Sequence, residues 1–118
     1  MTGFLMSGGL KSAQSTWGQP AEWCDYSGVI DSRPIGVTLL TDPASFRPSW
    51  WHNRDYGVFV ANPFGRDAMK QGVKSVVTVR RGENFRLRFG AVIHTGTAYR
   101  PADAYRAFLG SNSVERDR

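Results

Sequence analysis

The sequence predicts an all-β fold, an antiparallel β-sandwich portion with a short C-terminal helix. Thirteen glycines and six prolines divide the apolar residues into short runs, and such punctuation favours strands and turns over long helices. Several runs alternate with the period of two that is typical of strands. With 118 residues the chain has the length of one small domain, so we expect a single core.

Five segments carry strand patterns of this kind. The second and third alternate over their whole length, and the third ends at the turn-initiating pair Asn62-Pro63. The last two flank residues 81–83, and a short connection that contains glycine predicts a hairpin between them. The predicted strands are 21–29, 33–41, 56–62, 73–80 and 84–95.

The remaining segments predict loops, one helix and a tail. Residues 1–19 show no sustained period and predict an irregular lead-in, while two prolines make 42–49 a loop. The helix is expected to begin at Pro101, a favoured first helical position, and to end at Gly110. The polar residues after Gly110 predict disorder. The predicted division is a domain at 1–110 and a disordered tail at 111–118.

Composition excludes several classes of protein. No run approaches the roughly 20 apolar residues of a membrane span, so we predict no membrane segment. The net charge of +5 comes mainly from arginines that are spread along the chain, which does not predict a nucleic-acid interface. Residues 1–6 lack the features of a secretory signal, and the compartment stays open. The single Cys24 cannot form an internal disulfide and is predicted to be buried.

The densest group of ring and hydrogen-bonding side chains lies between Arg47 and Asn62. Such a group suits a polar ligand, because aromatic faces cover the C–H surfaces of a sugar while polar groups fix its hydroxyls. We predict Trp51 as a stacking platform, with Arg47, Arg54 and Asn62 as polar contacts. The alternative is that the tryptophans plug a loop against the core.

His52 and Asp55 are the predicted catalytic residues. A histidine titrates near neutral pH and can serve as a general base or acid, and Asp55 is close enough in sequence to orient it. In an extended segment the two side chains point to opposite sides, so their hydrogen bond requires a bend. A structural, hydrogen-bonded His52 is the alternative.

Asp25 and His94 complete the candidates. Asp25 follows Trp23 by two residues and is a candidate ligand-binding residue that could face a pocket, although a turn cap or a salt bridge is the favoured role. His94 can meet His52 only through tertiary pairing. The histidines lack the spacing of metal ligands and the chain has no phosphate-binding glycine loop, so we predict no metal and no cofactor.

Six short motifs recur together in one bacterial family. They are Trp23-Cys24-Asp25-Tyr26-Ser27-Gly28, Gly36-Val37, Asp42-Pro43, Phe46-Arg47-Pro48, Trp51-His52-Asn53-Arg54-Asp55-Tyr56-Gly57 and Asn62-Pro63-Phe64-Gly65. With them the chain resembles the PmoA-like family over nearly all of 8–109. The Trp-His-x-Arg and Asn-Pro-Phe-Gly motifs are the most specific.

The resemblance implies the C-terminal part of a longer β-sandwich, since family members carry a further β-rich half before this segment. That missing N-terminal half is a predicted partner of this chain. The family carries the label methane oxygenase, but that membrane enzyme needs hydrophobic helices, which this sequence lacks, so we reject the activity. The sandwich is similar to sugar-binding, galactose-mutarotase-like folds, and many relatives look exported.

Two functions remain open. The first is carbohydrate-related binding or processing by the Trp51-His52-Arg54 segment, which is expected to leave its strand as a loop and to hold a saccharide ligand. The second is a structural or interaction module without catalysis, in which the same cluster locks loops between sheets. The sequence does not decide between an enzyme and a binding module.

Overall fold

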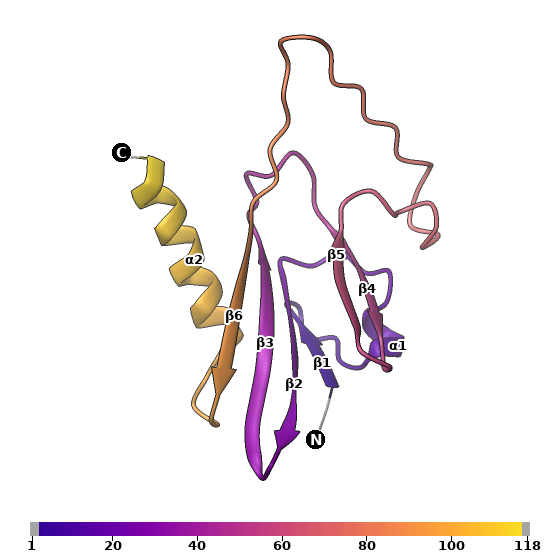
Figure 1. Cartoon of the computed structure of the whole chain (residues 1–118). Helices are drawn as coiled ribbons and strands as arrows, with labels where there is room; N and C mark the ends of the chain where they lie inside the picture. Colours follow the sequence, from indigo (N-terminus) through magenta and orange to yellow (C-terminus); the bar gives the residue numbers. More distant parts are fainter. Residues whose placement is uncertain (1–2, 117–118) are drawn as a thin grey trace.

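The computed structural model describes residues 3–116, with side chains described as far as residue 111, and confirms a mostly β, antiparallel, sandwich-like fold (Figure 1). A four-stranded sheet has the order β1-β2-β3-β6, and a two-stranded sheet pairs β4 with β5. The elements are β1 Gly3–Met6, α1 Ala13–Thr16, β2 Trp23–Ile30, β3 Arg33–Thr41, β4 Trp50–Arg54, β5 Val58–Asn62, β6 Phe89–Thr95 and α2 Pro101–Arg116.

The hairpin of β2 and β3 forms the centre of the larger sheet. Its turn consists of Asp31 and Ser32, which both have positive φ, 51° and 64°. Two-residue turns of this conformation match the natural twist of the strands. β2 therefore continues to Ile30, beyond the predicted stop, and the register places Asp25 opposite Thr38.

The segment before β2 is more regular than predicted. β1 pairs with β2, and Phe4 and Met6 are both buried. α1 follows, and the Ser12 hydroxyl caps it by accepting a hydrogen bond from the Ser15 amide. The prediction of an irregular lead-in is wrong because a four-residue strand is too short to show a period.

The β4–β5 hairpin covers one face of the larger sheet over β1 and β2 (Figure 1). Phe4, Met6, Cys24 and Trp51 form the buried cluster between them. Phe59 of β5 joins it, with its ring centroid 5.4 Å from that of Phe4. We call this side of the larger sheet the hairpin face.

α2 packs on the opposite side, which we call the helix face. Phe108 of α2 lies over Gly90 of β6, where a Cβ atom would come within 2.8 Å of the phenylalanine ring. Tyr105 donates a hydrogen bond to Glu22 at 3.0 Å. The glycine thus lets the helix approach the sheet closely.

The C-terminal helix is longer than predicted. It continues past Gly110 to Arg116, so the predicted end at Gly110 is wrong, and the last two residues of the predicted tail lie outside the described residues. A single glycine lowers helix stability by only about 1 kcal/mol, which a helix packed on a sheet tolerates. Within residues 3–116, no helix is long and apolar enough to cross a membrane.

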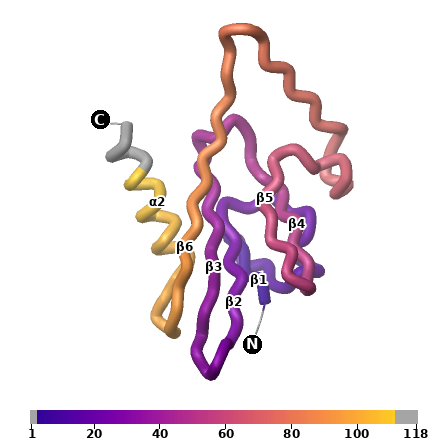
Figure 2. Tube along the Cα trace, in the orientation of Figure 1, coloured from indigo at the N-terminus to yellow at the C-terminus, as the bar shows by residue number. Residues whose placement is uncertain are grey.

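A long connection, residues 63–88, joins β5 to β6 and extends beyond both sheets (Figure 2). The predicted turn is present, because the Glu83 amide donates to the Arg80 carbonyl at 2.9 Å. The predicted strand 73–80 does not form, and the following strand begins only at Phe89. The predicted hairpin is therefore wrong.

The end of the connection pairs with a loop rather than with 73–80. The Phe46 amide donates to the Arg86 carbonyl and the Asp42 amide donates to the Arg88 carbonyl, both at 3.1 Å. These bonds continue the pairing of β3 with β6 into the loop after β3. A strand cannot persist without a partner for its backbone groups.

Part of the hairpin face is not covered by any described residue. It lies over β3 and β6, where Ile93 is 79% exposed and Ile35 is 37% exposed. Together with Tyr26 and Val37 these residues line an apolar hollow of about 350 Å³. Exposed apolar patches of this kind favour association. The predicted N-terminal half stays a prediction.

Ile93→Thr is expected to reduce self-association of the chain. The change removes apolar surface from the open part of the hairpin face and keeps a β-branched residue in β6. Light scattering over a concentration series measures the effect, with Val76→Thr in the long connection as the control. Equal scattering by the wild-type chain and Ile93→Thr would contradict this expectation.

Cys24 is expected to resist alkylation in the folded chain. Its side chain is fully buried in the core cluster, and burial raises the pKa of the thiol to about 12. Only the thiolate reacts, so labelling by iodoacetamide should require unfolding. Fast, complete labelling of the native chain, at the rate seen in denaturant, would show that this core is open.

Candidate functional site

The predicted ligand cluster lies on a strand rather than in a loop. Trp50–Arg54 is β4, and it pairs with β5 through a turn at 55–57. Gly57 has a φ of 99°, which glycine adopts at little cost. The expectation that the tryptophan-histidine-arginine segment leaves its strand is therefore wrong, and its side chains alternate between two faces.

Trp51 lies on the inward face and is 0% exposed. Its indole Nε1 donates to the Ala21 carbonyl at 3.0 Å, and its ring stacks near Phe59 with centroids 5.9 Å apart. A ring enclosed in this way cannot receive a sugar. The prediction that Trp51 is a stacking platform is therefore wrong. The alternative, that this tryptophan packs into the core, is confirmed.

His52 lies on the outward face of β4 and contacts Trp17 rather than Asp55. The Trp17 indole Nε1 donates to His52 Nδ1 at 3.3 Å, and the two rings meet edge to face. Arg54 shares this face, with its guanidinium carbon 4.8 Å from the Trp17 ring centroid.

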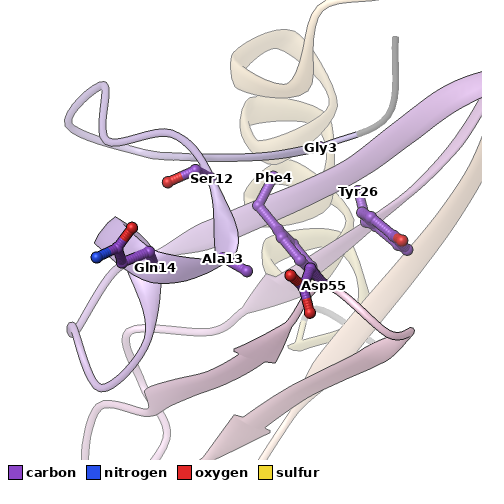
Figure 3. Close-up of a pocket in the computed structure, with 7 residues that line it drawn as sticks. All are labelled: Gly3, Phe4, Ser12, Ala13, Gln14, Tyr26 and Asp55. Carbon is purple, nitrogen blue, oxygen red and sulfur yellow. The ribbon is translucent and has the colours of Figure 1, made fainter.

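Asp55 lies in the exposed turn of the β4–β5 hairpin. It lines a pocket of about 370 Å³ together with Phe4, Tyr26 and Ser12 (Figure 3). No hydrogen bond joins Asp55 to His52, both of which are described. The predicted catalytic pair is therefore wrong, because the strand continues through Arg54 and turns only afterwards.

The side chains of Arg47 and Asn62 both make hydrogen bonds in the turn that follows β5, and these bonds stabilise the fold. Arg47 donates to the Pro63 carbonyl at 3.3 Å and to the Ser75 hydroxyl. The Asn62 side chain accepts a hydrogen bond from the Phe64 amide at 2.8 Å, the bond that asparagine typically makes in turns. Neither residue lines the pocket beside Asp55 or the apolar hollow over β3 and β6.

A different polar cluster lies on the helix face, where Asp25 of β2 meets His94 of β6. Their side chains reach across β3, and His94 Nε2 lies 2.6 Å from Asp25 Oδ1. Both residues are largely buried. This pair was missed because nothing in the sequence shows which strands flank β3.

Gly36 makes room for this contact. It lies on β3 opposite His94 and opposite Ser27. A Cβ atom at Gly36 would come 2.6 Å from His94 Cε1 and 2.7 Å from Ser27 Cβ, closer than atoms can pack. The absence of a side chain therefore lets the imidazole lie across β3 and reach Asp25.

Thr38 and Tyr99 complete the cluster. The Thr38 hydroxyl donates to Asp25 Oδ1 at 2.6 Å, and it therefore accepts from the Tyr99 hydroxyl at 2.7 Å. Burial raises the pKa of Tyr99, and the charge of Asp25 adds to the rise, so the phenol keeps its proton. The Tyr99 ring also stacks on His94 with centroids 3.7 Å apart.

Three residues of this cluster line a pocket of about 280 Å³, which we call the His94 pocket. Asp25, His94 and Tyr99 supply its polar wall, at the connection between β6 and α2. The apolar wall includes Leu5 and Val29. Of the predicted ligand-binding residues, Asp25 lines this pocket.

The cluster is not a metal centre of the usual kind. Among the described residues, no three His, Cys, Asp or Glu side chains lie close enough to hold a metal ion. The chemistry available at the His94 pocket is hydrogen bonding and proton transfer by an oriented histidine.

The chain is thus a sandwich-like β domain with a histidine–carboxylate pocket on the helix face of its larger sheet. It belongs to the Family of unknown function (DUF6807), whose model matches residues 2–108. No curated protein and no solved structure matches the chain. The resemblance to PmoA-like proteins stays a prediction.

Gly36→Ala is expected to displace His94 and to lower the free energy of unfolding by about 1–3 kcal/mol, the usual cost of overpacking. Denaturant unfolding measures the energy, and the NMR resonances of the His94 ring report its movement. Gly3→Ala is the matched control, since no atom lies within 4 Å of a Cβ at that position. Unchanged His94 resonances in Gly36→Ala would contradict the role given to this glycine.

Proposed function

We propose that this chain binds a neutral saccharide, or another small ligand rich in hydroxyl groups, in the His94 pocket. The hydrogen bond between His94 Nε2 and Asp25 Oδ1 carries the proposal. A carboxylate accepts the proton of one ring nitrogen and so leaves the other as an acceptor. His94 Nδ1 has no hydrogen-bond partner among the described residues, and it is the atom that would accept a ligand hydroxyl.

The walls of the pocket support a ligand of this kind. Leu5, Val29 and Pro34 provide apolar surface for C–H groups, beside the polar edge of Asp25 and His94. Pockets for drug-sized ligands hold about 300–1,000 Å³, so about 280 Å³ suits a single ring. The proposal keeps the predicted ligand class and moves the site from the β4 segment to the helix face.

A structural role for the cluster is the second candidate. Asp25, Thr38 and His94 tie three strands together, and Tyr99 ties the connection before α2 to them. Buried polar networks that are fully hydrogen-bonded stabilise a unique fold without any ligand. This candidate predicts a large stability cost and no binding.

His94→Phe separates the two candidates. Phenylalanine keeps a ring to stack on Tyr99 and removes the acceptor atom, while His52→Phe on β4 is the matched control. Calorimetry against a panel of neutral monosaccharides and disaccharides should find a ligand for the wild-type chain and for His52→Phe. His94→Phe should bind it about tenfold or more weakly.

The melting temperature of each variant completes the test. If no saccharide in the panel binds the wild-type chain and His94→Phe lowers the melting temperature by more than about 10 °C, the cluster is structural. Equal binding by the wild-type chain and His94→Phe would place the ligand elsewhere.

A further inference from the structure

The outward face of the β4–β5 hairpin carries a second group of functional side chains, remote from the His94 pocket. Trp50, His52 and Arg54 alternate on it and are each half-buried. Trp17, which follows α1, packs against two of them. We call Trp17, His52 and Arg54 the Arg54 site.

Arg54 packs on the Trp17 ring and has no anionic partner within the part of the chain whose side chains are described. Its guanidinium carbon lies 4.8 Å from the Trp17 ring centroid, a typical cation–π geometry. No ion pair or hydrogen bond joins its side chain to a residue of the described part. A guanidinium has five N–H donors, and stacking on a ring leaves these donors directed along its edges.

Trp17 also determines how His52 presents its donor. Because the Trp17 indole donates to His52 Nδ1, that nitrogen is an acceptor and the ring proton lies on Nε2. His52 Nε2 has no hydrogen-bond partner among the described residues. The Arg54 site therefore offers N–H donors from two neighbouring side chains on one strand face.

Among the described residues, no carboxylate forms an ion pair with Arg54 or Arg66. Asp55, the nearest carboxylate in sequence, lines the pocket that includes Phe4 and Tyr26 instead. Arg66 adds a further positive charge, with its guanidinium carbon 6.0 Å from the Trp50 ring centroid. Donors and positive charge together match an anionic group.

We propose that the Arg54 site binds the oxyanion group of a small ligand, a carboxylate, sulfate or phosphate, through Arg54 and the Nε2–H of His52. Arg54 occupies one face of the Trp17 ring, so the ligand meets guanidinium edges rather than that face. This arrangement favours an acidic saccharide or a phosphorylated small molecule over stacked nucleobases. The site is independent of the saccharide proposed for the His94 pocket.

NMR titration of the whole chain with sulfate, phosphate, glucuronate and glucose tests the proposal. We expect the anions to shift the side-chain resonances of Trp17, His52 and Arg54, and glucose to leave them unchanged. Arg54→Gln should weaken anion binding about tenfold or more. Trp17→Phe, which removes the indole donor, should also weaken it. Arg81→Gln, an exposed arginine in the long connection, is the matched control and should bind like the wild-type chain.

Comparison of the four titrations also identifies the class of ligand that carries the oxyanion. Preference for glucuronate points to an acidic saccharide, and preference for phosphate points to a phosphorylated ligand; both support the site. Three results overturn it. They are no shifts with any anion, equal weakening by Arg54→Gln and Arg81→Gln, and binding of a single-stranded oligonucleotide without binding of the small anions.

Discussion

Trp51→Ala is expected to lower the free energy of unfolding by about 3–5 kcal/mol, the usual cost of removing a large buried aromatic side chain. Trp51 is enclosed between the β4–β5 hairpin and the larger sheet, where it contacts Phe59 and donates to the Ala21 carbonyl. The change removes apolar contacts, a hydrogen bond and the side chain that packs between the two sheets. Urea unfolding measured by fluorescence of the remaining tryptophans gives the energy.

Trp50→Ala is the matched control for this measurement. Trp50 is the preceding residue on β4 but faces outward and is only half-buried. Its removal should cost less than half as much, because burial determines the loss of transfer free energy. Equal costs for the two substitutions would contradict the assignment of the inward face of β4.

Asp25→Ala is expected to lower the free energy of unfolding by about 2–4 kcal/mol. Thr38 and His94 both donate to Asp25 Oδ1, and each buried donor left without a partner costs about 1–3 kcal/mol. The Tyr99 stack loses its anchor through the same change. Denaturant unfolding gives the energy, and the NMR signals of Tyr99 report the loosened connection before α2.

Asp67→Ala provides the control for the loss of a carboxylate. Asp67 is exposed in the connection after β5, and exposed substitutions usually change stability by less than about 0.5 kcal/mol. If Asp25→Ala costs no more than Asp67→Ala, the Asp25–His94 pair does not contribute to the fold as described.

The central strands could be predicted because their signals are local. Alternation defines β3 over its full length, and the turn residues after β2 lie where a two-residue hairpin needs them. Once β2 and β3 form a hairpin, the facing of Asp25 and Thr38 follows from counting residues outward from the turn. The favoured interpretation of Asp25 from the sequence, a turn cap or a salt bridge, matches its contact with His94 at 2.6 Å.

The His94 pocket could not be predicted because it depends on a distant pairing. β6 lies beside β3 after a connection of 26 residues, 63–88, and no local pattern states which strand accepts it. Gly36 carried the one available signal, since a glycine in the middle of a strand often marks the close approach of another group. Without the register, the approaching group could not be named.

The tryptophan pair on β4 shows the limit of alternation. Period two assigns Trp50 and Trp51 to opposite faces, yet it does not say which face meets the core. The core lies on the Trp51 side because Phe4, Met6 and Cys24 are there to receive it. Phe4 and Met6 come from β1, which is too short to be recognised in the sequence, and Cys24 comes from β2.

The most direct measurement is the tautomer of His94, read from the ¹⁵N chemical shifts of its ring nitrogens by NMR at mildly alkaline pH. A proton on Nε2 and a free Nδ1 is the predicted result, with the Nε2 proton shifted strongly downfield by its bond to Asp25. That state leaves a proton acceptor in the wall of the pocket. A proton on Nδ1, or a spectrum identical to that of Asp25→Ala, would contradict the oriented histidine on which the proposed function depends.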